Sequence, residues 1–264
     1  MIRFPSPGRF SRRFVRVWQR NLSVYRKTWK ISFLPPLLEP LLYLLAFGVG
    51  LAVMVGTLSY AGREISYLAF IAPALLSVAI MYNAFFETTY NSFVRMYYQK
   101  TFDAMLATPL NLEEIILGEL VWAATKSVIA TLLMGSVISA FGLLAFPSAL
   151  WLLPLALLGG LAFGALGMIC TGLMPNIETF NVPIFLIITP MFLFSGTFFP
   201  LANLPAWAQA LAQILPLTHL VALARACALH AWHPELWLSL AYLILFTALA
   251  APLAIALMVR RLIH

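Results

Sequence analysis

The chain has 264 residues, of which 62% are hydrophobic and only 9% charged, and its mean hydropathy is +0.94. Soluble domains carry about 25% charged residues, so this composition excludes an ordinary soluble protein and predicts a chain embedded in a bilayer. The formal net charge is +7, the two cysteines are too few for a disulfide framework, and no Cys, His or acidic spacing suggests a metal site.

Residues 1–30 hold nine of the sixteen cations and no acidic residue. Apolar and aromatic side chains recur among them at near-helical spacing: Phe10, Phe14, Val17, Trp18, Tyr25 and Trp29. This pattern predicts a basic amphipathic helix, a domain of its own at residues 1–30, lying in the cytoplasmic interface of the membrane. Nucleic-acid binding is the rival interpretation of a basic arm, and the interleaved aromatic face beside a membrane span argues against it.

Residues 31–264 form a predicted transmembrane domain. Six apolar stretches can each cross a hydrocarbon core that takes about 20 helical residues. They are residues 31–55, 66–90, 115–144, 149–172, 181–199 and 236–259. With both termini in the cytoplasm, thirteen of the sixteen cations lie inside, as the positive-inside rule requires. The predicted fold is therefore an all-α, polytopic protein of six transmembrane helices in the inner membrane.

The longest polar interruption, residues 86–126, separates the second and third spans. Thr101 is the predicted N-cap of a short helix, and Asp103 falls in the first turn, where a carboxylate suits the helix dipole. Three apolar side chains share one face of this helix at i, i+3 and i+4: Phe102, Met105 and Leu106. The stretch has two interpretations, a cytoplasmic elbow that another protein grips or a helical hairpin lying on the membrane surface.

A break follows this short helix. Pro109 cannot continue a helix, and Asn111 with Glu114 three residues later has the pattern of a capping box. The elbow is therefore predicted to be helix, break, helix.

Lys126 is the cation predicted to lie deepest in the membrane. It follows Ile115 by eleven residues, or about 16 Å of helix, which places it near the midplane. An ammonium there needs a partner, and the candidates are Glu87 first, Glu39 second and Glu119 third. Such a pair either holds the hairpin rigid, so that movement of the elbow reaches the membrane core, or is a static structural contact.

The stretch at about 201–228 is apolar but interrupted by Pro205 and Pro216. It is too broken to cross the membrane as one helix. The sequence predicts one or two short re-entrant or interfacial helices at the outer face, between the fifth and sixth spans.

Four segments carry a family resemblance. They are FETTYNSFVRM, TFDAMLATPLNLEEIILGELVWAATK, ITPMFLFSGTFFPLANLP and LPLTHLVALAR. Together they resemble the permeases of type-2 ABC (ABC-2 type) exporters, in particular the NodJ-like permeases of lipo-oligosaccharide (nodulation-factor) exporters. In that family the elbow is the coupling helix, which sits in a groove of a separate ATPase subunit.

The resemblance implies several partners and one set of contact residues. Two copies of the chain and two ATPase subunits would form the exporter, with ATP and magnesium held by the ATPase, because this chain has no G-x-x-x-x-G-K-[ST] motif. Membrane lipid surrounds it and no nucleic acid is involved. The residues implied in coupling are Thr101, Phe102, Asp103, Met105, Leu106, Glu113 and Glu114.

The implied substrate path runs between the two copies, along spans one and five. Aromatic side chains suit both sugars and acyl chains, and four are candidates for lining this path: Tyr43, Phe47, Phe192 and Phe194. Each of them could equally be a core or lipid-facing aromatic residue.

The predicted function is outward transport of an amphiphilic substrate, a lipo-oligosaccharide or lipid-linked glycan. The alternative is export of drugs or other hydrophobic compounds, which the same motifs would serve. A secondary transporter and a channel rank lower, because no internal repeat and no ring of polar residues is evident. No set of residues suggests a catalytic site, and ATP hydrolysis is expected in the partner chain.

Overall fold

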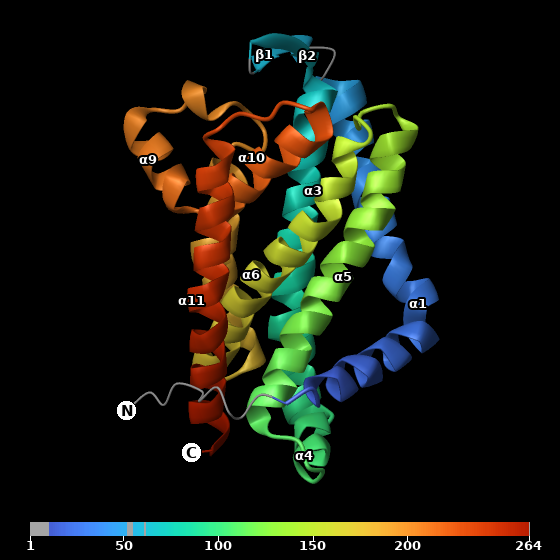
Figure 1. Ribbon diagram of the computed structural model, residues 1–264, viewed down its shortest axis with the longest axis vertical. Helices are drawn as coiled ribbons and strands as arrows, with labels where there is room; N and C mark the ends of the chain where they lie inside the picture. The colour runs from blue at the N-terminus through green and yellow to red at the C-terminus, as the bar shows by residue number, and fades with distance from the viewer. Residues whose placement is uncertain (1–10, 52–54, 61, 264) are drawn as a thin grey trace.

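The structure, a computed structural model, describes residues 11–51, 55–60 and 62–263, and for part of the first helix it describes the backbone alone. These residues are almost entirely helical, so the prediction of an all-α membrane protein is confirmed. The long helices run side by side, and the start of α1 and the end of α11 lie at the same end as the short helix α4 (Figure 1).

Eleven regular elements organise the fold. They are α1 (Phe14–Leu45), β1 (Thr57–Tyr60), β2 (Arg63–Ser66), α3 (Tyr67–Phe86), α4 (Thr101–Leu106), α5 (Leu112–Ala140), α6 (Leu152–Leu173), α8 (Thr189–Phe194), α9 (Ala206–Ile214), α10 (Pro216–Leu229) and α11 (Leu236–Ile263). The π-helical segments η2 (Ala46–Leu51), η3 (Glu87–Asn91), η4 (Val94–Tyr98) and η7 (Ile184–Ile188) extend some of these helices. Short helical pieces at Ser148–Trp151, Ile177–Phe180, Asn181–Pro183 and Leu201–Asn203 complete the described chain.

Within the described residues, five helical stretches are long and apolar enough to cross a membrane. They are Tyr67–Tyr98, Leu112–Ala140, Ser148–Leu173, Ile177–Phe194 and Leu236–Leu262. The first predicted span, residues 31–55, corresponds to the later part of α1 and to η2, and residues 52–54 lie outside the described chain. The second span continues about two turns beyond its predicted end at residue 90, because its polar residues find partners inside the protein.

The amphipathic segment and the first span form one helix. α1 runs without a break from Phe14 to Leu45, so no change of secondary structure marks the predicted boundary at residue 30. In Figure 1 its first part crosses the lower end of the molecule and its second part turns to rise along the bundle. Residues 1–10 of the predicted amphipathic domain lie outside the described residues.

A β-hairpin lies between the first and second predicted spans. β1 and β2 pair antiparallel, with Leu58 opposite Ile65, and lie at the end of the molecule farthest from α4 (Figure 1). Gly62 adopts a φ of +74° in the turn, where glycine carries no side-chain penalty.

Glycines allow α6 to pack closely against its neighbours. A Cβ on Gly160 would lie 2.7 Å from the Cα of Ala124 in α5, and a Cβ on Gly167 would lie 2.8 Å from the carbonyl oxygen of Phe85 in α3. Small residues permit such close approach between membrane helices. The Gly160-x-x-x-Gly164 pattern therefore packs α6 within the chain, against α5.

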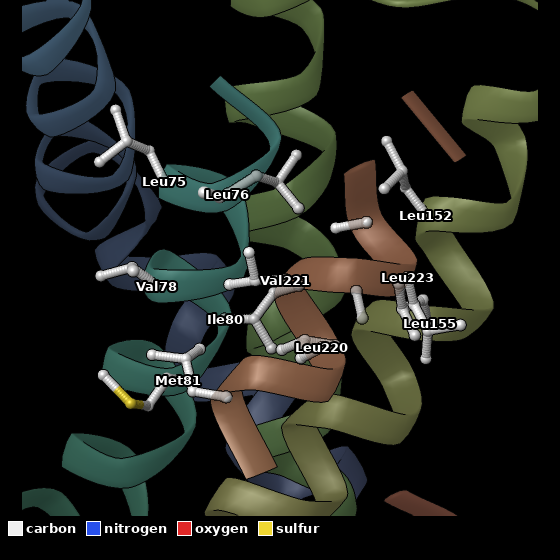
Figure 2. Close-up of a cluster of buried hydrophobic side chains, with 14 of the residues drawn as sticks. Leu75, Leu76, Val78, Ile80, Met81, Leu152, Leu155, Leu220, Val221 and Leu223 are labelled. Carbon is white, nitrogen blue, oxygen red and sulfur yellow. The ribbon is translucent and has the colours of Figure 1, made fainter. Parts of the chain in front are cut away.

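The predicted re-entrant segment forms α9 and α10, which meet at 87°. Figure 2 shows side chains of α10, including Leu220 and Val221, lying between those of α3 and α6, including Ile80 and Leu155. The apolar core of the bundle therefore continues through α10.

Arg225 fastens α10 in this position. Its buried guanidinium donates hydrogen bonds to the carbonyl oxygens of Phe70 (3.0 Å), Gly196 and Thr197 (2.6 and 3.1 Å), and lies 3.6 Å from the centre of the Phe70 ring. Among the described residues no carboxylate forms an ion pair with it. Backbone carbonyls and an aromatic face thus take the place of a counter-ion.

Candidate functional site

The elbow has the predicted order of helix, break and helix, but its first cap is one residue earlier than expected. Lys100, not Thr101, occupies the N-cap of α4, and no side chain caps this helix end. Lys100 has a left-handed φ of +51°, which reverses the chain sharply after η4. Thr101 is therefore the first helical residue, and Asp103 lies in the first turn as predicted.

α4 offers only part of its apolar face to the surroundings. Phe102 is 1% exposed and packs in a core cluster with Phe93, Ile115 and Ile116. Leu106 is 43% exposed, and Met105 is half-buried. Phe102 therefore fixes α4 to the bundle and is not part of the outer surface.

The outer surface of α4 continues from Leu106 into the turn that follows. Asp103 and Ala104 are exposed on α4, and so are residues 107–109. We call this set, with Leu106, the elbow surface. It is the part of the elbow that a partner could reach.

Two predicted coupling residues, Glu113 and Glu114, lie inside the chain. They are 6% and 1% exposed. Glu114 completes the predicted capping box by accepting a hydrogen bond from the Asn111 amide at 3.0 Å. Its other oxygen accepts from the amide of Ser11 at 3.3 Å and from the Ser11 hydroxyl. Glu114 thus ties the N-terminal segment to the elbow, and neither acid belongs to the elbow surface.

A buried carboxylate, Glu87, has four hydrogen-bond or ion-pair partners. Lys126 Nζ and an Arg95 nitrogen each lie 2.8 Å from its oxygens. Trp122 Nε1 donates at 3.0 Å and Asn91 Nδ2 at 2.7 Å. Glu87, the first candidate partner of Lys126, is therefore in contact with it. Only 2% of the Glu87 side chain is exposed.

A second buried carboxylate, Glu119, completes the cluster. Arg95 bridges to it through Nε at 2.9 Å and through a second guanidinium nitrogen. Ser92 donates to it at 3.1 Å, and Asn21 of α1 donates at 2.8 Å. Glu119 is thus occupied by Arg95 instead of Lys126, and the side chain of Glu39, the remaining candidate, lies outside the described residues.

The spacing of the charged residues in the sequence indicates this four-charge cluster, although the prediction was limited to a single partner for Lys126. Glu87 and Arg95 are eight residues apart, and Glu119 and Lys126 are seven apart, so each pair lies two turns apart on one helix face. The two helices are consecutive and antiparallel, which places acid opposite base twice. The contribution of Asn21 has no such signal, because it depends on how α1 lies across the bundle.

Aromatic rings from three parts of the chain form a row. Ring centres are 6.0 Å apart between Tyr43 and Phe47, 5.5 Å between Phe47 and Phe198, 5.0 Å between Phe198 and Phe192, and 6.2 Å between Phe192 and Tyr82. Three of the four predicted path residues thus come together. Phe194, the fourth, is half-buried on α8 and has no ring contact with this row among the described residues.

The arrangement suits mechanical coupling. Glu87, Arg95, Glu119 and Lys126 join η3 and η4 of the second span to α5, and Asn21 adds α1. Within the described residues no group of His, Cys, Asp and Glu is placed to hold a metal ion. Paired charges therefore connect the second span to α5, and Asn21 connects them to α1.

Comparison with known proteins assigns the chain to a family. The model of the ABC-2 type transporter family matches residues 12–229. Nodulation protein J of Rhizobium leguminosarum bv. trifolii is 42% identical over 80% of this chain and 79% of its own length. Nodulation protein J of Sinorhizobium fredii is 36% identical over 95% of this chain and 94% of its own length. The inner membrane transport permease YadH of Escherichia coli is 25% identical over 78% of this chain and 78% of its own length. The chain therefore belongs to the ABC-2 type transporter family and is a multi-span permease subunit.

Proposed function

We propose that this chain is the permease of an exporter that moves an amphiphilic lipo-oligosaccharide or lipid-linked glycan outward across the inner membrane. Two copies would enclose the path, and two separate ABC ATPase subunits would bind ATP and magnesium. The relatives called Nodulation protein J and the resemblance to lipo-oligosaccharide exporters support this substrate class.

The observation that carries the proposal is the braced elbow. Leu106 and its exposed neighbours present a small apolar surface at the same end as the start of α1 and the end of α11 (Figure 1). Closure of the ATPases around ATP would push on this surface, and the charge cluster would pass the displacement to α3 and α5. Rigid, discretely packed elements of this kind transmit small shifts efficiently.

The aromatic row is the proposed contact surface for the substrate. Tyr43 and Phe47 come from α1 and its π-helical extension, and Phe192 and Phe198 come from α8 and the segment after it. These rings are half-buried, and the parts of the ring faces that remain accessible can stack on sugar rings and also pack against acyl chains. One surface of this kind accommodates both halves of an amphiphile.

Co-purification with candidate ABC ATPases tests the proposal. We expect the wild-type chain to retain a cognate ATPase and its ATP hydrolysis to rise with glycolipid. Leu106→Asp places a charge on the elbow surface and should reduce ATPase retention at least tenfold. Ser59→Asp, an exposed change in β1 at the far end, should leave retention unchanged.

Two results would contradict the proposal. A chain that retains no ABC ATPase has no motor for export. A Leu106→Asp variant that binds the ATPase like the wild type would show that the elbow surface is not the docking site. Stimulation by hydrophobic drugs but not by glycolipids would reassign the substrate class.

A further inference from the structure

A polar cavity of about 180 Å³ lies between the first part of α1 and the charge cluster. Arg20 and Tyr25 of α1 line one side, and Glu87, Arg95 and Lys126 line the other. Exposed residues such as Thr28 and Gln99 also line the cavity, which is therefore open to the surface. The volume exceeds the space of a single water, about 10–15 Å³ in this measure, more than tenfold and admits a group of several heavy atoms.

The charges around the cavity do not balance. Arg20, Arg95 and Lys126 supply three positive charges, whereas Glu87 and Glu119 supply two negative charges. Cations held in a partly buried site need compensation, because desolvation removes the screening of water. The surplus of one positive charge therefore favours an anionic occupant.

Arg20 is the cation with the weakest compensation. Its guanidinium donates to the Asn21 side chain at 2.9 Å and to the Thr101 hydroxyl at 3.4 Å, both of them uncharged. Burial, and then the nearby Arg95 charge, lower the pKa of Arg20 below its ordinary value, although Glu119 opposes this shift. An anion between the two guanidinium groups would relieve both costs.

Unused hydrogen-bond donors face the same space. Lys126 Nζ has three donors, its 2.8 Å contact with Glu87 uses one, and 22% of its side chain is exposed. Among the described residues no partner accepts from the Tyr25 hydroxyl, and the Tyr25 ring meets Trp122 edge-on at 5.6 Å. Donors on cations and a hydroxyl are what the oxygens of a phosphate accept.

We propose that this cavity, which we call the headgroup pocket, binds the phosphate of an anionic lipid headgroup or free phosphate. A basic amphipathic helix forms one wall, and such helices lie at the level of lipid phosphates. Arg20 also contacts Thr101, the first residue of α4, so an occupant of the pocket would touch the elbow. The inference concerns binding and does not rest on the proposed transport activity.

Thermal unfolding of the purified chain tests the proposal. The chain is placed in nanodiscs of phosphatidylcholine alone or with added phosphatidylglycerol, and separately in detergent with inorganic phosphate. We expect an anion to raise the unfolding temperature of the wild type. Thr28→Asp puts a negative charge on a lining residue and should weaken the apparent affinity at least tenfold, whereas Ser23→Asp, an exposed change on α1 outside the lining, should not.

A second pair of variants keeps the test independent of folding defects. Arg20→Gln should abolish the anion-dependent shift, and Lys27→Gln, which removes an exposed cation from the same helix, should keep it. A shift with phosphatidylglycerol alone assigns a lipid headgroup, and a shift with inorganic phosphate assigns free phosphate. Equal responses of Arg20→Gln and Lys27→Gln, equal responses of Thr28→Asp and Ser23→Asp, or no shift with either phosphatidylglycerol or inorganic phosphate would overturn the proposal.

Discussion

Glu87 is the residue on which two helices depend for charge balance. It pairs with Arg95 of η4 and with Lys126 of α5, each at 2.8 Å. Arg95 has a second carboxylate in Glu119, but Lys126 has no other acidic partner among the described residues. Lys126 and Glu87 therefore form the more exclusive of the two pairings.

A double-mutant cycle should measure this pairing. With Lys126→Met and Glu87→Gln we expect a coupling free energy of about 1–3 kcal/mol, because contacting buried partners are not additive. Denaturant unfolding in detergent is the measurement. The exposed pair Lys100–Asp103, at 3.8 Å, is the matched control and should show no measurable coupling. If Lys126→Met leaves folding and transport intact, the pair contributes nothing to either.

Arg225 should be irreplaceable by lysine, although both residues carry one positive charge. A compact ammonium cannot serve carbonyls of α3 and of the Gly196–Thr197 turn in a planar fork. We expect Arg225→Lys to lower the free energy of unfolding by about 2 kcal/mol, since buried carbonyls lose donors. Differential scanning fluorimetry, which follows thermal unfolding, measures this loss of stability. Arg63→Lys in the exposed strand β2 should change nothing, and equal effects of the two would contradict this role.

At the scale of elements, α1 is held to α5 at a point where no side chain fits. A Cβ on Gly118 would lie 2.6 Å from the Cβ of Val17 and 2.9 Å from the carbonyl oxygen of Phe14. Further along, Trp18 Nε1 donates to Thr125 Oγ1 at 3.0 Å. The part of α1 that the sequence predicts to be amphipathic is therefore packed on the bundle.

Gly118→Ala should consequently destabilise the chain. Overpacking costs about 1–3 kcal/mol, which outweighs the better helix propensity of alanine. Gly135→Ala is the matched control on the same helix, because nothing lies within 4 Å of its added Cβ. We expect this control to stabilise the helix slightly, and unfolding temperatures compare the two. A Gly118→Ala variant as stable as Gly135→Ala would mean that α1 does not press on α5.

The elements that the sequence predicts well are those that depend only on residues close together in the chain. The break at Pro109 and the capping box at Asn111 and Glu114 depend on local chemistry, and the structure has both. The burial of Phe102 and Glu113 was not predictable, because it depends on which face of α4 and α5 meets the rest of the chain. The left-handed Lys100 is equally non-local, since the reversal after η4 demands it.

At the scale of the whole molecule, the two ends differ in kind. One end carries the start of α1, the end of α11 and the elbow surface, and the other carries the β-hairpin (Figure 1). The distribution of cations predicts that the elbow end lies in the cytoplasm. Membrane orientation is therefore testable with one reporter at each end.

Single-cysteine labelling should give opposite results at Ala104 and Ser59. Both positions are exposed, and the native Cys170 and Cys227 are buried. In intact spheroplasts a membrane-impermeant maleimide should label Ser59→Cys and leave Ala104→Cys unlabelled until the cells are lysed. The unsubstituted chain is the control for background. Labelling of Ala104→Cys without lysis would reverse the orientation and remove the elbow from any cytoplasmic motor.

The π-helical turns of η3 and η4 fix how α4 is rotated about the helix axis relative to α3. Each such turn spans one residue more than an α-helical turn, and η3 and η4 lie between α3 and α4. An α-helix advances about 100° per residue, so deleting a single residue there would swing α4 through more than a quarter of a circle. The direction in which α4 points around the axis of the second span therefore depends on these two π-helical turns. Reversible tightening of one turn would be enough to change that direction.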